Sequence, residues 1–225
     1  MSKPRVTLFD LDHTLLPIDS DYSWGEFTQQ IGWTDPVDFK RRNDAFYAHY
    51  VAGTLDVHDY VRFATEALRL RGEAAYRDAH VRFMREWILP LRPSAQELVR
   101  QHQAAGDQLA IVTATNELVT RPIAAAFGVP ELIAVELARD AAGWITGEIT
   151  GVPSMREGKV VRVAAWLRAR GLDWLDVETT FYSDSTNDLP LLEQVDHPVA
   201  TNPDPRLRTI ALERGWRILD LFRPQ

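Results

Sequence analysis

The stretch that decides the fold reads VTLFDLDHTLL over residues 6–16. Its first part is rich in β-branched and apolar residues, which predicts a buried strand that ends at Phe9. Two acids, Asp10 and Asp12, follow at once. In a regular strand they would point to opposite faces, but the apolar run has ended, so the chain can turn both toward one spot beyond the strand. Ligands of open parallel sheets bind at this carboxyl edge.

This pair of acids has two interpretations. Neighbouring carboxylates repel each other and are costly to bury, unless a cation lies between them or one of them keeps a proton. Either arrangement would indicate a chemically active site. Alternatively, Asp10 and Asp12 are solvated loop residues after an edge strand. The choice between the two depends on residues much later in the chain.

The size and composition of the chain narrow the classes of function. Its 225 residues, 45% of them hydrophobic, suffice for one large domain or for a domain with an inserted partner. The net charge of −7 argues against nucleic acid or an anionic membrane as the main partner. The absence of cysteine excludes disulfides and sulfur-based zinc sites. No long apolar segment opens the chain, and no run approaches the ~20 apolar residues that cross a bilayer, so we expect a cytoplasmic protein, either a monomer or a homodimer.

Residues 17–89 contain no convincing strand and carry 13 of the 22 aromatic residues of the chain. Apolar spacing, cap residues and glycines predict a small helical bundle with an aromatic core. The helices are expected over residues 22–31, 37–51, 57–70 and, after Gly72, up to about residue 89.

Strands and helices alternate after Pro90 and Pro93, which predicts a parallel sheet with helices on both faces. The expected fold class is α/β, a doubly wound parallel sheet with an inserted helical cap domain. Residues 1–16 and 90–225 would form the sheet domain and residues 17–89 the cap. Further strands are expected over residues 108–113, 132–137, 177–183, 198–201 and 216–219, and a small hairpin off the main sheet over residues 144–151.

Four polar stretches fall at predicted strand ends or helix starts. Because parallel strands place their carboxyl ends at one edge of the sheet, we expect these stretches to converge. They are Asp10 with Asp12, Thr113 after a strand, Lys159 early in a helix, and the sequence SDSTND over residues 183–188.

The converging groups are an acidic cluster, a hydroxyl and an ammonium. Mg²⁺ prefers oxygen ligands, which Asp10, Asp184 and Asp188 can supply. The hydroxyl of Thr113 and the charge of Lys159 can hold phosphate oxygens. Each signal is weak alone, since such residues also cap helices and turns or lie solvated on a helix. Their common placement at strand ends favours a phosphate site with a carboxylate nucleophile.

The four stretches resemble the motifs of the haloacid dehalogenase superfamily, in its phosphoserine-phosphatase-like branch (subfamily IB). The order is Asp-x-Asp-x-Thr, Thr, Lys and Asp-x-x-x-Asp. The insert after the first motif matches the cap of that branch, and residues 143–151 match a hairpin before its lysine. The resemblance covers the whole chain and is more specific for superfamily than for substrate.

This resemblance implies roles for individual residues. Asp10 would be the nucleophile, passing through an aspartyl-phosphate, and Asp12 would protonate the leaving alcohol and then activate water. Phosphate would be bound by Thr113, Ala114, Lys159 and Asn187. The ligands of the Mg²⁺ cofactor would be Asp10, Asp12 through its carbonyl, Asp184 and Asp188.

Departures from the phosphoserine phosphatase pattern concern the substrate. Ala114 and Thr115 stand where that branch has two glycines, and Asp19 stands where it has a glutamate that meets the substrate's amino group. Its cap arginine aligns with Ala64, and Arg62 lies half a turn away. The sequence Thr-Ala-Thr-Asn is similar to proteins labelled histidinol-phosphatase. We therefore expect a Mg²⁺-dependent phosphatase of a small phosphoserine- or histidinol-phosphate-like ester, with Asp19 and Arg62 as substrate-binding candidates.

Other functions are compatible with parts of this pattern. A receiver domain also accepts a phosphoryl group on a strand-end Asp, with a Thr and a Lys on later strands. It would need neither Asp12 nor a helical insert of this length. An inactive binding scaffold would need no complete motif set, and a phosphotransferase or mutase would differ only in the acceptor. The six histidines show no metal-ligand spacing and are expected to be structural or solvated.

Overall fold

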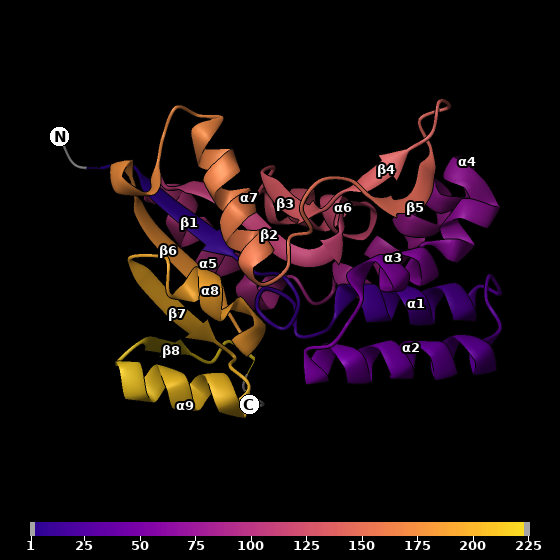
Figure 1. Cartoon of the computed structure of the whole chain (residues 1–225), viewed down its shortest axis with the longest axis horizontal. Coiled ribbons are helices and arrows are strands. Elements are labelled where there is room, and N and C mark those ends of the chain that lie inside the picture. Colours follow the sequence, from indigo (N-terminus) through magenta and orange to yellow (C-terminus); the bar gives the residue numbers. More distant parts are fainter. Residues whose placement is uncertain (1–2, 223–225) are drawn as a thin grey trace.

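The computed structural model describes residues 3–222, which form a parallel sheet with helices on both faces and a helical region beside it (Figure 1). The strand order is β3-β2-β1-β6-β7-β8, and all neighbouring pairs are parallel. The strands are β1 (Arg5–Phe9), β2 (Gln108–Asn116), β3 (Leu132–Val135), β6 (Glu178–Ser183), β7 (His197–Thr201) and β8 (Arg217–Leu219). The predicted α/β fold class is confirmed.

The first strand lies in the middle of the sheet. Phe9, its last residue, pairs with Ile111 of β2 on one side and with Tyr182 of β6 on the other. Parallel register therefore brings the segments that follow β1 and β6 to the same edge as the end of β2. Asp10 and Asp184, the first residues after β1 and β6, therefore leave the sheet at this edge.

Two hydrophobic clusters cover the two faces of the sheet. One contains Leu8 of β1 and packs α7 and α9 on it through residues such as Val163 and Leu207. The other contains Phe9 and joins α5 and α6 to the helical region. The helices of the sheet domain are α5 (Pro93–Ala104), α6 (Glu117–Phe127), α7 (Glu157–Arg168), α8 (Leu189–Leu192) and α9 (Pro205–Arg214), with 3₁₀ turns η2 (Trp174–Asp176) and η3 (Thr186–Asp188).

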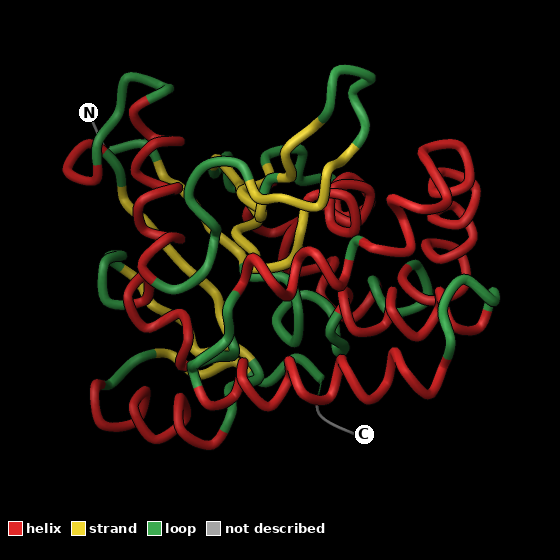
Figure 2. The backbone as a smooth tube through the Cα atoms, turned by 45° about the vertical axis from the view of Figure 1, so that its right-hand side comes forward, coloured by secondary structure: helices red, strands yellow, loops and turns green. Residues whose placement is uncertain are grey.

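The helical region lies beside the sheet, as the tube view shows (Figure 2). Three of its helices begin at an aspartate whose side chain accepts backbone N–H bonds, namely Asp19, Asp35 and Asp56. The region comprises α1 (Ser20–Gln30), α2 (Pro36–Ala52), α3 (Val57–Ala64), α4 (Glu66–Phe83) and a π-helical turn η1 (Met84–Ile88). The exact cap boundaries, residues 17–89, stay a prediction.

Two predicted helix boundaries in the cap can be compared with the structure. The helix expected over residues 57–70 ends at Ala64, because the Thr65 hydroxyl bonds the Val61 carbonyl at 2.6 Å and the chain starts a new helix. The predicted break at Gly72 is confirmed, because this residue has non-helical angles of φ 80° and ψ 172° and α4 therefore consists of two helical segments that meet there at a kink.

The strands of the small hairpin span other residues than those predicted. Its strands are β4 (Leu137–Arg139) and β5 (Ile145–Ile149), which pair antiparallel. The apolar run 132–137 is therefore divided between the main sheet and the hairpin, at Glu136, whose carbonyl accepts the Thr150 N–H at 2.9 Å. The hairpin lies against α3 and α4. Within residues 3–222, no helix is both long and apolar enough to cross a membrane.

Candidate active site

Asp10 directly follows β1, at the carboxyl edge of the sheet. Its backbone N–H donates to the Tyr182 carbonyl at 2.9 Å, which continues the ladder one step past Phe9. The residue is 7% exposed, and its carboxylate accepts from Lys159 Nζ at 2.8 Å and from Thr14 Oγ1 at 3.3 Å. Burial raises the pKa of Asp10, and the charge of Lys159 opposes that rise.

Lys159 comes from the first turn of α7 and lies between two acids. Its ammonium donates to Asp10 Oδ1 at 2.8 Å and to Asp188 Oδ2 at 2.7 Å, and the residue is 2% exposed. Burial alone would lower the pKa of this lysine, but the two carboxylates raise it above its ordinary value. Ser183 Oγ donates to the same oxygen of Asp188 at 2.7 Å. The ammonium is therefore held charged and in place.

Asp184 joins the cluster through Thr14, whose hydroxyl lies 3.4 Å from Asp184 Oδ1. Burial, followed by the charges of Asp10 and Asp188, raises the pKa of Asp184 well above its usual range. Three carboxylates thus share one ammonium, an imbalance that a divalent cation would relieve. These oxygen donors suit Mg²⁺ chemically.

The predicted magnesium ligands are not yet grouped around a common point. Among residues 3–222, no three acidic or histidine side chains form a ready set of metal ligands. Lys159 lies between Asp10 and Asp188 instead. The assignment of Asp10, Asp12, Asp184 and Asp188 to a metal therefore stays a prediction.

Asp12 is held at both oxygens of its carboxylate. Oδ1 accepts from the Ser20 backbone N–H at 2.7 Å and Oδ2 from Thr115 Oγ1 at 2.8 Å. Burial, followed by the nearby charge of Asp19, raises the pKa of Asp12 to about 6. Sequence reasoning did not assign a role to Thr115, although its place two residues after Thr113 was the available signal.

Thr113 lies within β2, which runs on to Asn116 rather than ending at residue 113 as expected. Its hydroxyl is buried and accepts from the Thr115 N–H at 3.1 Å. Ala114 between them is half-buried. Asn187 is the last of the predicted phosphate ligands, and its side chain interacts with Tyr50 of α2. Tyr50 was not singled out from the sequence, because its position over the sheet edge depends on how α2 packs.

The start of α1 contributes two further acids. Asp19 accepts the Tyr22 N–H at 2.8 Å, and burial raises its pKa. Asp21 accepts from the Tyr60 hydroxyl at 2.5 Å and from Asn116 Nδ2 at 3.2 Å, and burial raises its pKa to about 6. The Asp21 contacts, which join α1 and α3 to β2, were also missed by sequence reasoning.

Arg62 lies on α3, against the hairpin. Its guanidinium pairs with Asp59 at 2.5 Å and with Glu148 of the hairpin at 3.0 Å, and its side chain is 44% exposed. The structure therefore does not bring it to the cluster around Asp10. Its role in substrate binding stays a prediction.

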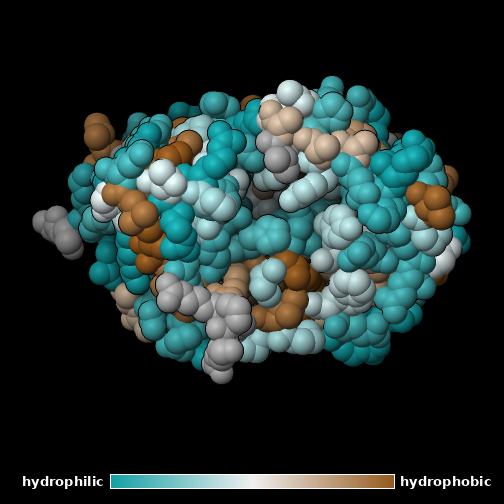
Figure 3. All heavy atoms as spheres, turned by 90° about the horizontal axis from the view of Figure 1, so that it is seen from below, coloured by the Kyte–Doolittle hydropathy of each residue, from teal (hydrophilic) through white to brown (hydrophobic). Residues whose placement is uncertain are grey.

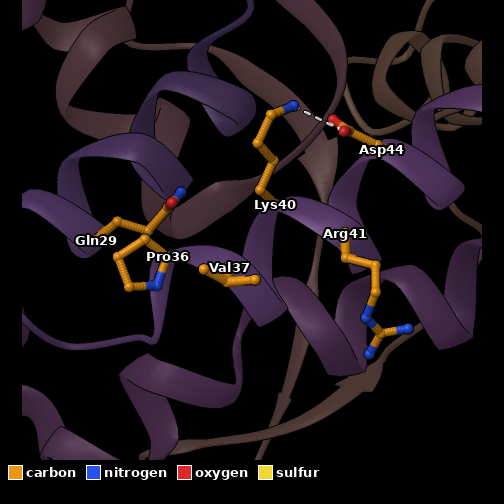
Figure 4. A pocket seen from close by; sticks show the side chains of 6 residues that line it. All are labelled: Gln29, Pro36, Val37, Lys40, Arg41 and Asp44. Atoms are coloured by element: carbon orange, nitrogen blue, oxygen red, sulfur yellow. Dashed lines mark hydrogen bonds and ion pairs between the residues drawn. The ribbon is translucent and has the colours of Figure 1, made fainter.

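Figure 4 shows a separate surface depression between the end of α1 and the start of α2. Lys40 and Asp44 pair there at 2.7 Å, both largely exposed. This depression shares no residue with the group formed by Asp10, Lys159, Asp184 and Asp188, which we call the strand-end cluster. The face of the molecule on the side of α2 and α9 is mostly hydrophilic, with a hollow near its middle (Figure 3).

The candidate site is thus a buried array of Asp10, Lys159 and Asp188 at the carboxyl edge of the sheet. The model of the haloacid dehalogenase-like hydrolase family matches residues 7–193. The chain belongs to this family.

Individual relatives agree with the family match. The chain is 38% identical over 218 residues to a histidinol-phosphatase of Neisseria meningitidis serogroup C (strain 8013), covering 96% of this chain and 98% of that protein. It is 49% identical to a crystal structure of a protein with unknown function from Bordetella pertussis Tohama I, with a TM-score of 0.93, covering 98% of this chain and 100% of that one. The predicted enzyme class, a phosphatase of this superfamily, is confirmed.

Phosphoserine phosphatase structures share the fold at lower identity. A substrate-bound phosphoserine phosphatase complex matches with a TM-score of 0.66 at 16% identity, over 97% of this chain and 94% of that chain. This likeness confirms the predicted architecture.

Proposed function

We propose that the protein hydrolyses a small phosphate monoester through an aspartyl-phosphate on Asp10. The observation that carries the proposal is the ammonium of Lys159, which lies 2.8 Å from the Asp10 carboxylate in a buried site. A phosphoryl group brought to this place would meet a fixed positive charge and the Asp10 carboxyl group together. The ammonium would offset charge on the transferring oxygens while the carboxylate attacks phosphorus.

Asp12 supplies the proton transfers. With a pKa of about 6, it keeps a proton in part of the molecules near neutral pH and can donate it to the departing alcohol oxygen. The bond between phosphorus and that oxygen breaks as the bond to Asp10 forms. Asp12, now ionised, then accepts a proton from the water that attacks phosphorus, which frees Asp10 and releases inorganic phosphate.

Thr113, Ala114 and Asn187 are proposed to help hold the phosphoryl group. Mg²⁺, bound by Asp10, Asp184, Asp188 and the Asp12 carbonyl, would reduce the repulsion between nucleophile and phosphate. The imbalance of three carboxylates against one ammonium supports this cofactor.

The proposed substrate is an ester whose alcohol carries a positive charge. Asp19 and Asp21 lie beside Asp12, near the place of the leaving alcohol, and the nearby cation Lys159 is already paired with two acids. The 38% identity to a histidinol-phosphatase supports an ester like histidinol phosphate, which carries an amine. We propose that the protein acts on it in the cytoplasm.

A panel of phosphate esters tests this function. Release of inorganic phosphate is measured for histidinol phosphate, phosphoserine, an uncharged alkyl phosphate and p-nitrophenyl phosphate, with Mg²⁺ and with EDTA. We expect the two esters that carry an amine, histidinol phosphate and phosphoserine, to have the highest kcat/KM. We expect EDTA to abolish turnover until Mg²⁺ is restored. Full activity in excess chelator would contradict the cofactor, and equal turnover of all esters would contradict the substrate class. Transfer to an added alcohol would identify a phosphotransferase.

A further inference from the structure

Arg156 occupies a backbone conformation that arginine rarely adopts. Its φ is 52° and its ψ is −125°, and the Gly158 N–H donates to the Met155 carbonyl at 2.9 Å across it. These angles belong to the second residue of a type II′ turn, where glycine is strongly preferred. A residue with a Cβ costs roughly 1–3 kcal/mol there. The turn would be more stable with glycine, so the arginine side chain needs another explanation.

The side chain reaches from the sheet domain to the cap. Its Nη2 lies 2.8 Å from the place that a Cβ at Gly53 would take. Gly53 ends α2 with φ 75° and its N–H bonds the last turn of that helix. The carboxyl end of a helix carries partial negative charge, which favours a cation. Arg156 is half-buried and, among the residues that the structure describes, its guanidinium has no ion-pair or hydrogen-bond partner.

The same end of α2 lies near the strand-end cluster. Tyr50, three residues before Gly53, interacts with Asn187 and lies in the field of Asp188, Asp10 and Lys159. In Figure 1, α2 runs toward the sheet domain and ends beside it. The last turn of α2 therefore meets the sheet domain at Asn187 and at Arg156. Arg156 is also three residues before Lys159, on the turn that opens α7.

We propose that Arg156 is a positioning residue that docks the end of α2 on the sheet domain and so places Tyr50 over the phosphate site. The proposal rests on the proposed function of that site. It explains why a strained arginine stands at a glycine position. It also explains why residue 53 is glycine, since a Cβ there would strike the guanidinium as well as oppose the positive φ.

The substitution Arg156→Gly separates this role from a structural one. It removes the docking contact and relieves the strained turn, so we expect the unfolding midpoint to stay equal or rise. We expect kcat/KM for p-nitrophenyl phosphate to fall by about tenfold or more, because small displacements of positioned groups have large kinetic effects. Arg168→Ala, which removes an exposed charge from the other end of α7, serves as the matched control and should retain parental activity.

A double-mutant cycle with Tyr50→Phe tests the coupling. If both residues act through one contact, the double variant should lose less activity than the product of the single losses. Multiplicative losses would overturn the proposal. A parental kcat/KM in Arg156→Gly would also overturn it. The same holds if Arg156→Gly loses activity together with a lower unfolding midpoint.

Hydrogen exchange provides a readout without substrate. Amides of residues 47–54 should exchange faster in Arg156→Gly than in the parent and in Arg168→Ala, and equal exchange would overturn the docking. If the parent hydrolyses no ester, the proposed function fails, while this measurement still decides whether Arg156 holds α2.

Discussion

The strand-end cluster and the aromatic core of the cap are held together by opposite means. In the first, Lys159 lies between Asp10 and Asp188, and burial raises the pKa of each acid. In the second, Trp24 is 2% exposed and its ring lies within 5.2–6.4 Å of five other rings. These are Phe27, Trp33, Tyr76, His80 and Phe83.

This difference separates two roles: the charged cluster provides groups for chemistry, and the aromatic core contributes to stability. The charged cluster buries acids at a cost in free energy, and the ammonium of Lys159 opposes the rise of the Asp10 pKa, which favours the ionised carboxylate that attack on phosphorus requires. The aromatic core buries apolar area and depends little on charge. The pH dependence of stability should therefore distinguish the two regions.

The largest effect is expected from Lys159→Met. Without the ammonium, buried carboxylates lose their counter-charge, which costs about 3–5 kcal/mol of unfolding free energy near neutral pH. The folded-state pKa values of the acids then lie further above their unfolded values, so stability should recover as the pH falls and the acids bind protons. Turnover should fall on the order of a thousandfold. Urea unfolding at several pH values measures the first effect, and a loss that does not change with pH would contradict it.

A smaller effect is expected from Trp24→Leu. The substitution leaves a cavity among the rings and should cost about 2–3 kcal/mol. This loss should be nearly the same at every pH tested, in contrast to that of Lys159→Met. A loss that disappears in acid would show that Trp24 acts through a titrating neighbour rather than through packing.

The smallest effect concerns His80, the titratable member of the aromatic core. Burial lowers its pKa to about 4, and its Nε2 lies 3.1 Å from the Val119 carbonyl. Because the folded-state pKa lies below the unfolded value of about 6.5, its contribution is complete above about pH 6.5 and is lost as the pH falls toward 4.

The variant His80→Gln keeps a donor for the Val119 carbonyl but does not titrate. Between about pH 7.5 and pH 5, the parent should lose about 2 kcal/mol more unfolding free energy than this variant. Identical pH profiles for the two proteins would contradict the assignment.

The sequence predicted those features that depend on local pattern. An apolar run followed by Asp10, and alternating strands and helices after Pro93, were enough for the fold class. The family was predicted from the resemblance of the four motifs and their order along the chain. Parallel register explains why Lys159 and Asp188 meet Asp10, although they are far apart in the chain. The magnesium ligands and the substrate residues stay predictions.

Features that depend on how α1 and α2 pack on the sheet were not predicted. Tyr50 and the Asp21–Asn116 contact belong to this group, since no spacing within the chain indicates which helix face meets β2. The positive φ of Arg156 was missed for another reason: sequence propensity places glycine in such turns, and here the chain has arginine.

The nucleophile is tested most directly by trapping. The protein is mixed with ³²P-labelled ester and quenched in acid, and one portion is counted for protein-bound label. A second portion is reduced with borohydride, which expels the phosphate and converts the aspartyl-phosphate to homoserine that peptide mass spectrometry can locate. We expect trapped label and homoserine at position 10, and neither in Asp10→Asn, which should fold like the parent. Turnover in Asp10→Asn, or a modified residue other than Asp10, would contradict the account.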